Sequence, residues 1–181
     1  MTDARLFEAF VRRYQDMVFA TAVRLLGSPT EAEDVAQTVF LRAFQRFDRI
    51  GGSPAAAGWL KTVTRNECLN HLSRYRSRWR FFSELAGSRH ENAAEGYPAR
   101  LASSDSTVSR LEATARHEEL ERAIRELPEH QRVPLVLFHF EELSYQEIAD
   151  ALHVSLGKVK TDIHRAREAL RTLLSGDDAP R

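Results

Sequence analysis

The chain has 181 residues, of which 43% are apolar and 29% are charged, and its 26 basic side chains balance its 26 acidic ones. This length suits one ordinary domain or two small ones. No apolar stretch approaches the roughly 20 residues that a membrane-spanning helix needs. The single cysteine, Cys68, excludes an internal disulfide framework and favours a reducing compartment. We therefore expect a helix-rich cytoplasmic protein without membrane insertion.

The zero net charge conceals three segments of different charge. Residues 51–90 hold seven basic and two acidic side chains, and residues 153–174 hold five basic and two acidic ones. Between them, residues 91–120 hold six acidic and three basic side chains. Taken singly, each basic segment is best explained as a solvated helix face. Together they indicate two anion-binding surfaces joined by a tether.

The N-terminal segment has the pattern of a single amphipathic helix. Apolar residues recur at three- and four-residue spacing from Leu6 to Leu25, and Gly27 is a natural stop. Ser28 then has the features of a helix cap, with proline at the first helical position and Glu31 placed to reach back. We therefore predict two successive helices with a short break between them.

The second of these helices carries apolar residues as far as Phe47 and is ended by Ile-Gly-Gly-Ser-Pro at residues 50–54. A third helix is predicted over residues 56–80. Three helices of this length can share one small core. The predicted apolar face of the third helix consists of Trp59, Leu60, Val63, Cys68, Leu69 and Leu72.

The periodicity fades over residues 81–109, where Gly, Ser, Pro, Asn and Glu dominate. Such a stretch is too long for a loop inside a compact domain, so we predict a flexible linker there and a disordered tail at 176–181. No segment alternates with period two, so the predicted fold is all-α, with two small helical domains at 1–80 and 110–175. In the second domain, helices are predicted from about Val108 to 127 and over 129–141, 144–152 and 156–174.

The last two predicted helices form a helix-turn-helix pattern. Ser144 and Glu147 make a capping box, and residues 153–155 make a tight turn. An outer face of basic residues on the final helix suits the DNA major groove. The residues alone also allow an amphipathic hairpin with a solvated basic face. The apolar stripe of the final helix is Leu156, Val159, Ile163, Ala166, Leu170 and Leu173, and its outer face carries Lys160, Thr161, His164, Arg165, Arg167 and Arg171.

Motifs in both halves resemble one family, the extracytoplasmic-function (ECF) group of bacterial RNA polymerase sigma-70 factors. Four motifs resemble region 4 of that group: LPEHQR at 127–132, LSYQEIA at 143–149, LGKVKT at 156–161 and HRARE at 164–168. Four others resemble region 2: EDVAQTVFLRAF at 33–44, Trp59-Leu60, Arg65-Asn66 and NHL at 70–72. The resemblance covers nearly the whole chain except the linker and the tail. It implies a sigma factor that directs core RNA polymerase to specific promoters in a stress or signal response. It also implies that an anti-sigma factor binds this sigma factor and holds it inactive.

By the same resemblance, the helix that contains residues 33–44 docks on the clamp helices of the largest polymerase subunit. The matching residues are Asp34, Gln37, Phe40 and Arg42. Polar groups beside apolar ones agree with a protein interface, although Phe40 is equally well explained as a core residue. Thr38 stands where the family often has an acid, so no charge contact is expected there.

The resemblance places recognition and melting of the minus-ten promoter element at residues 50–80. Opening a duplex needs cations along the backbone, a ring for stacking and a pocket for an extruded base. The loop at 51–58, where the family holds that base, is too poor in hydrogen-bonding side chains to indicate a base preference. Trp59 is equally well explained as a core residue. The candidate residues are Trp59, Lys61, Arg65, Asn66, Asn70, Arg74, Arg76 and Arg78.

The minus-thirty-five element would be read by the final helix. Where the family usually has Thr and Arg, this chain has Lys158 and Asp162. Pairing of Asp162 with Lys158 or Arg165 would be worth about 0.3–0.5 kcal/mol at an exposed site. Alternatively, Asp162 accepts a hydrogen bond from a cytosine amino group. Its position beside the apolar stripe favours pairing. The candidate residues are Lys158, Lys160, Thr161, His164, Arg165 and Arg167.

No catalytic, cofactor or metal site is predicted, so the chain is not expected to be an enzyme. Cys68 and His71 lie one helical turn apart, but no third group orients them, and a buried cysteine is expected. The seven histidines show no paired ligand spacing. The alternative function is an autonomous helix-turn-helix regulator that binds operator DNA without polymerase. The neutral charge disfavours that alternative, because a stand-alone DNA binder is expected to be distinctly basic.

Overall fold

The structure is a computed structural model that describes residues 3–73 and 107–175. Every regular element in these two ranges is a helix, which confirms the predicted all-α class. The helices form two compact units, an N-terminal unit of α1–α4 and a C-terminal unit of α6–α9. The predicted linker lies outside the described residues except for 107–109, which begin α6, and so does the predicted tail. None of the helices in the described ranges combines the length and hydropathy needed to cross a membrane.

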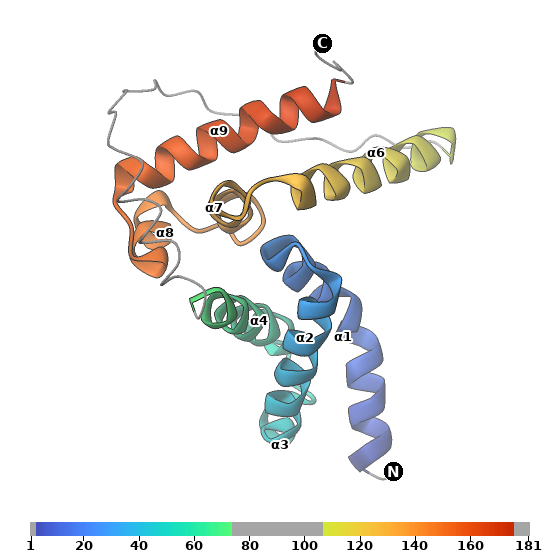
Figure 1. Ribbon diagram of the computed structural model, residues 1–181. Coiled ribbons are helices and arrows are strands. Elements are labelled where there is room, and N and C mark those ends of the chain that lie inside the picture. Colours follow the sequence, from blue (N-terminus) through green and yellow to red (C-terminus); the bar gives the residue numbers. More distant parts are fainter. Residues whose placement is uncertain (1–2, 74–106, 176–181) are drawn as a thin grey trace. The chain divides into compact units, whose positions relative to one another are not determined.

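The N-terminal unit is a three-helix bundle with one additional short helix. It contains α1 (Asp3–Leu26), α2 (Pro29–Phe44), α3 (Phe47–Ile50) and α4 (Ala56–Ser73). The three long helices pack pairwise on one another (Figure 1). Their core contains the fully buried Val18, Ala22, Leu25, Ala32, Val39, Leu60, Thr64 and Cys68.

The predicted break between α1 and α2 is confirmed. Gly27 follows α1 with φ of 73°, a conformation that glycine adopts without steric cost. The hydroxyl of Ser28 accepts a hydrogen bond from the Glu31 amide at 3.4 Å, and proline occupies the first turn. The Glu31 carboxylate lies 3.6 Å from Nε2 of His71 on α4, so this side chain faces the next helix and not its own cap.

The prediction of one helix from residue 29 to 50 is wrong, because α2 ends at Phe44 and α3 begins at Phe47. The break turns the Phe47 ring onto α1, where its centroid lies 5.2 Å from that of Phe7 and 5.5 Å from that of Phe10. Burying an aromatic ring in such a cluster outweighs the few hydrogen bonds that a continuous helix would add.

The buried face of α4 also differs from the prediction. Residues at four-residue spacing form the buried stripe, and this stripe includes the polar Thr64, whose hydroxyl donates to the Leu60 carbonyl at 2.7 Å. The Trp59 side chain is only half-buried and lies outside the stripe. Residues 74–80, the predicted end of this helix, lie outside the described residues. The stripe is Ala56, Leu60, Thr64, Cys68 and Leu72.

The C-terminal unit is built around one buried helix. It contains α6 (Thr107–Glu126), α7 (Glu129–His139), α8 (Tyr145–Leu152) and α9 (Leu156–Leu174). Residues 132–137 of α7 are all buried, and α7 packs on both α8 and α9, while α6 packs on α9. The fully buried side chains here are Ile124, Val136, Leu137, Ile148, Val159, Ile163 and Ala166.

Helices α8 and α9 form the predicted helix-turn-helix. Ser144 and Glu147 make the expected capping box, in which the Ser144 amide donates to Glu147 at 2.8 Å. His153 ends α8 in the left-handed conformation with φ of 53°, and the Ser155 hydroxyl accepts from the Lys158 amide at the start of α9. The predicted apolar stripe of α9 is buried only in its middle, since Leu156 and Leu173 at its ends are 38% and 43% exposed.

Candidate functional site

The outer surface of α2 holds the four residues predicted to contact polymerase, but on different sides. Asp34 and Gln37 are exposed, and Phe40 is half-buried. Gln37 and Phe40 both line an open groove between α1 and α2. Arg42 lies outside this groove, with Nη2 2.9 Å from Oε1 of Glu67 on α4. Arg42 therefore ties two helices of its own unit together.

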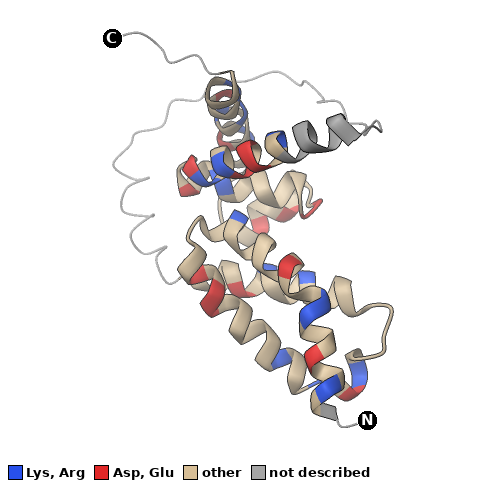
Figure 2. Cartoon of the chain, turned by 90° about the vertical axis from the view of Figure 1, so that its right-hand side faces the viewer, with Lys and Arg blue, Asp and Glu red and all other residues tan. Residues whose placement is uncertain are grey.

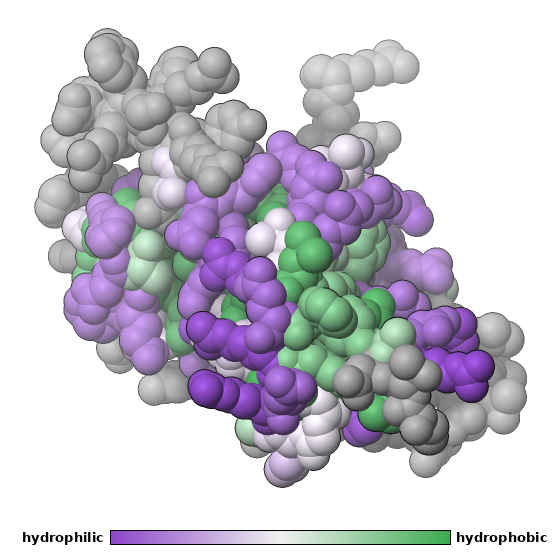
Figure 3. All heavy atoms as spheres, turned by 90° about the horizontal axis from the view of Figure 1, so that it is seen from below, coloured by the Kyte–Doolittle hydropathy of each residue, from purple (hydrophilic) through white to green (hydrophobic). Residues whose placement is uncertain are grey.

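The groove between α1 and α2 is mainly apolar and extends the α2 surface. Leu41 and Phe44 on its rim are 65% and 58% exposed, an unusual degree for such large apolar side chains. Viewed from below, hydrophobic residues form a patch bordered by hydrophilic ones (Figure 3). The groove is lined by apolar Phe7, Val11, Phe19, Ala36, Phe40, Leu41 and Phe44 and by polar Gln15, Asp16, Glu33 and Gln37.

This groove was not predicted, although the sequence of α2 contains a signal for it. Helix α2 has apolar residues beyond those needed for its buried stripe, and they fall at Phe40, Leu41 and Phe44. Phe44 stays exposed while its ring packs edge-on against that of Phe7, with the ring centroids 5.0 Å apart. A helix that is apolar on two sides needs a second partner besides its own core.

The predicted minus-ten residues that are described lie on α4. Asn66 and Asn70 are exposed and share with Trp59 the side of the helix opposite the buried stripe. Lys61 and Arg65 are half-buried and flank that stripe. The three remaining candidates, Arg74, Arg76 and Arg78, lie outside the described residues. Residues 56–58 of the predicted base-holding loop belong to α4, which begins at Ala56 as predicted, so residues 51–55 form the connection between α3 and α4.

The predicted minus-thirty-five residues lie on α9 in two environments. Lys160, His164 and Arg165 are exposed. Thr161 is half-buried, and its hydroxyl donates to the Gly157 carbonyl at 3.0 Å. Lys158 and Arg167 are each engaged with another side chain of the same unit. Basic and acidic residues both occur along the helices that Figure 2 colours.

Asp162 is not at an exposed site, and that part of the prediction is wrong. The residue is 4% exposed, and its Oδ2 accepts from Nζ of Lys158 at 2.8 Å. Asp162 therefore pairs with Lys158 as predicted, but the pair does not lie at an exposed site. A carboxylate buried to this degree cannot reach a cytosine in the major groove.

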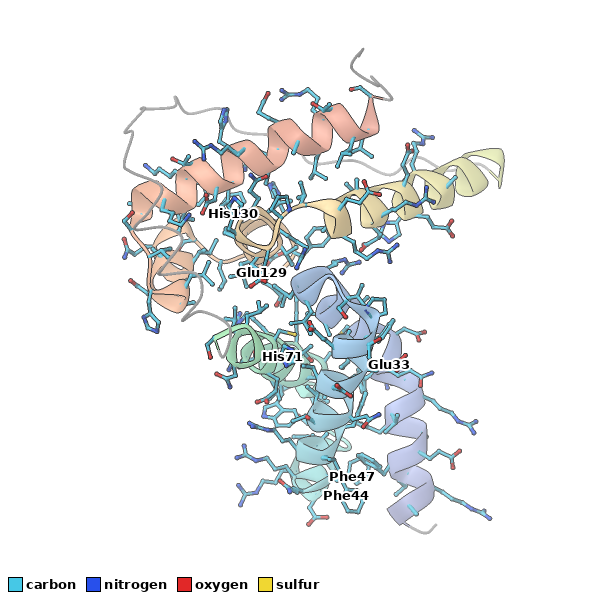
Figure 4. The ribbon with its side chains drawn as sticks, in the orientation of Figure 1. Glu33, Phe44, Phe47, His71, Glu129 and His130 are labelled. Atoms are coloured by element: carbon cyan, nitrogen blue, oxygen red, sulfur yellow. The ribbon has the colours of Figure 1, made fainter. Side chains whose placement is uncertain are left out.

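Two histidines of α7 lie against α9, and burial lowers the pKa of both. Burial lowers the pKa of His130, while the nearby charge of Asp162 acts to raise it. Figure 4 shows His130 on α7 beneath α9. Burial also lowers the pKa of His139, and the cationic Arg167 lowers it further. Both imidazoles are therefore held in the neutral form more strongly than an exposed histidine would be.

The environment of Cys68 agrees with the prediction of a buried cysteine. Its side chain is fully buried in the core of the N-terminal unit, as part of the α4 stripe. The neighbouring His71 has its Nε2 3.6 Å from the Glu31 carboxylate. A thiol in this position is inaccessible to a substrate, so packing explains its presence.

Comparisons with known proteins agree with both halves of the fold. Residues 10–79 match the family model of sigma-70 region 2, and residues 117–170 match that of sigma-70 region 4. The ECF RNA polymerase sigma factor SigW of Bacillus subtilis (strain 168) is 31% identical over 172 residues, which cover 95% of this chain and 90% of the relative. The ECF RNA polymerase sigma-E factor of Escherichia coli (strain K12) is 31% identical over 93% of this chain and 86% of its own.

Among solved structures, the chain is similar to the sigma factor RpoE of Bartonella quintana, solved in complex with the anti-sigma factor NepR. The TM-score is 0.48 with 26% identity, and the match covers 94% of this chain and 98% of the other. A bundle that matches region 2 followed by a helix-turn-helix that matches region 4 defines the sigma-70 class of transcription initiation factor. The chain belongs to the ECF group of that family.

Proposed function

We propose that the two units divide promoter recognition between them. The C-terminal unit binds the minus-thirty-five element through α9. The N-terminal unit binds core RNA polymerase through α2 and the minus-ten element through α4. The tether between the units raises the effective concentration of the second DNA contact once the first has formed. In this proposal the chain acts in the cytoplasm by binding alone, with domains at 1–80 and 110–175.

The helix-turn-helix carries the DNA part of this proposal. The core side of α9 is anchored by Val159, Ile163 and Ala166, which leaves the opposite side free to enter a groove. That side presents the exposed Lys160 and, one turn later, the exposed His164 and Arg165. Basic side chains at this spacing contact DNA phosphates. Those near the start of the helix can also reach the edges of bases. The half-buried Thr161 adds a methyl and a hydroxyl oxygen at the same surface.

The groove between α1 and α2 carries the polymerase part. Its exposed Leu41 and Phe44 supply apolar contact area, while Gln37 supplies hydrogen bonds that fix register. Asp16 and Glu33 at the groove give it an acidic edge, which suits an apolar helix flanked by basic side chains. Membership of the sigma-70 family supports core RNA polymerase as the occupant. We extend the contact to Asp34 and Arg42 from the sequence resemblance alone, because neither residue lines the groove.

The outward side of α4 carries the minus-ten part. The Trp59 ring is available for stacking because it lies outside the buried stripe, and Asn66 and Asn70 follow on the same side. Lys61 and Arg65 lie at the edge of this surface and supply positive charge. We extend the surface to Arg74, Arg76 and Arg78 from the sequence pattern alone.

A regulated release of the chain completes the proposal. RpoE of Bartonella quintana, to which this chain is similar, was solved with an anti-sigma factor. We propose that this chain is likewise held by an anti-sigma factor and released in a stress or signal response. An autonomous operator-binding regulator is the alternative function, and the zero net charge argues against it.

Competition for core RNA polymerase tests the docking surface. The full-length variants Gln37→Ala and Leu41→Ala remove groove contacts, and each should weaken competition with the wild-type chain about tenfold. Gln45→Ala is the matched control, because Gln45 is exposed just beyond α2 and does not line the groove. Helical content should be unchanged in all three. Equal competition by the groove variants and the control would contradict the assigned docking surface.

A further inference from the structure

The guanidinium group of Arg167 on α9 is held by two residues of α7. Its central carbon lies 5.5 Å from the centroid of the Phe138 ring, within the range of a cation–π contact. Its Nε donates to Nε2 of His139 at 3.4 Å, and its Nη2 lies 3.3 Å from the same nitrogen. The Phe138 ring is itself stacked on Tyr145 at the start of α8, with centroids 4.7 Å apart.

This arrangement fixes a long side chain before any DNA is present. A free arginine loses about 2 kcal/mol of rotamer entropy when it is immobilised. An arginine that is already held in place has lost part of this entropy on folding, so it binds a phosphate more tightly. The contacts with His139 use the Nε and Nη2 edge of the guanidinium. The donors on Nη1 are left for an incoming phosphate.

We propose that His139 and Phe138 are positioning residues that hold Arg167 ready to bind a phosphate of the minus-thirty-five element. The proposal rests on the proposed function of α9. Neither residue was among the predicted DNA contacts, and both lie in α7, before the helix-turn-helix begins. A neutral imidazole is required, because only an unprotonated Nε2 accepts from Arg167. The direction of the His139 pKa, lowered by burial and by Arg167, agrees with that state.

A purely structural role for this cluster makes a different prediction. If Arg167 only joined α7 to α9, removing its partner would lower the stability of the unit and leave the number of DNA phosphate contacts unchanged. That number is measured by the dependence of affinity on salt concentration, since each phosphate contact contributes about one unit of slope. Salt slope therefore separates positioning from packing.

The test uses the full chain bound to core RNA polymerase and a promoter fragment, with affinity measured over a series of salt concentrations. The key pair is His139→Gln and His139→Leu. Glutamine places an acceptor oxygen near the position of Nε2, whereas leucine has a similar size and no acceptor. We expect His139→Leu to lower affinity about fivefold and to reduce the salt slope, and His139→Gln to restore both. Phe138→Leu should act in the same direction as His139→Leu.

Two further variants separate failure of this inference from failure of the proposed function. Arg167→Ala should lower the salt slope by about one, and adding His139→Leu to it should cause no further loss. Lys160→Ala reports whether α9 binds DNA at all. If Arg167→Ala lowers affinity while His139→Leu has no effect, the positioning role is overturned and the function of α9 stands. If Lys160→Ala lowers affinity and Arg167→Ala does not, Arg167 is not a DNA contact and the inference fails. If neither Lys160→Ala nor Arg167→Ala changes affinity, the proposed DNA face itself is wrong.

Discussion

The ammonium group of Lys158 lies 2.8 Å from Oδ2 of Asp162, one turn further along α9, and the Asp162 side chain is 6% exposed. The carboxylate sits on the flank of α9 that faces α7, where its charge acts on His130. Lys158 is 36% exposed and reaches the carboxylate from the solvent side. The pair has a structural role, because leaving the buried carboxylate without its cation partner would be costly.

Replacing Asp162 by arginine should therefore destabilise the C-terminal unit. The variant puts a second cation next to Lys158 in a space that excludes water, and we expect the free energy of unfolding to fall by about 1–3 kcal/mol. Promoter binding should weaken as a result. Urea unfolding of the full chain measures the change, with Lys160→Ala as a control for loss of an exposed charge. Tighter promoter binding by Asp162→Arg with unchanged stability would show that this side chain is at the DNA surface.

The contrast between predicted and observed features of this chain has physical causes. Local signals were sufficient for the helix-turn-helix, because Ser144, Glu147 and Ser155 define helix ends through contacts with nearby backbone. The burial of Asp162 could not be predicted in this way, since it depends on the approach of α7, which lies 23 to 33 residues earlier in the chain. The break before Phe47 likewise depends on the rings of α1.

The functional surfaces were predictable to different degrees for a related reason. The outward residues of α9 follow from helical periodicity, because the buried stripe determines which residues lie opposite it. The surplus apolar residues of α2 signal one side of the groove, but the α1 residues that complete it are brought there only by the fold. The hydrogen bond from Arg167 to His139 joins residues that are 28 positions apart, and only the folded chain brings them together.

Replacing Gly51 by alanine should destabilise the N-terminal unit. A Cβ atom at this position would lie 2.7 Å from a ring carbon of Phe47 and 2.9 Å from the Phe47 carbonyl oxygen. The ring is packed against α1, so relief requires a shift of the aromatic cluster, and we expect a loss of about 1–3 kcal/mol. Gly52→Ala is a matched control, because a Cβ there meets no atom within 4 Å. Thermal unfolding should separate the two variants, and equal melting temperatures would contradict the packing of Phe47.

Replacing Glu142 by glycine should stabilise the C-terminal unit. Glu142 connects α7 to α8 with φ of 58°, a left-handed conformation that costs a residue with a Cβ about 1–2 kcal/mol. Part of the gain is offset by the greater freedom of glycine in the unfolded chain, so we expect a net stabilisation of about 0.5–1 kcal/mol. Glu142→Ala keeps the Cβ and removes the carboxylate, and it should show no gain. Stabilisation by alanine equal to that by glycine would assign the effect to charge.

The stability of the C-terminal unit should fall as the pH is lowered below about 6.5, the ordinary pKa of histidine. His130 and His139 both have lowered pKa values in the folded chain, so the unfolded chain binds more protons in this range. Unfolding then takes up protons, and acid favours it until the pH is below the folded pKa values as well. Urea unfolding at pH 7.5 and 5.5 measures the effect. The double variant His130→Gln, His139→Gln should show a smaller loss, and an unchanged loss would place its origin elsewhere.

The central claim is that this chain binds promoter DNA as a part of RNA polymerase. Sequencing of transcripts after overexpression supplies a promoter fragment, and a gel shift then compares that fragment with the chain alone, with core polymerase alone and with both. We predict a specific complex only when both are present, and one that weakens when Lys160 or His164 is replaced by alanine. Tight and specific binding of the fragment by the chain alone would contradict the account and favour an autonomous regulator.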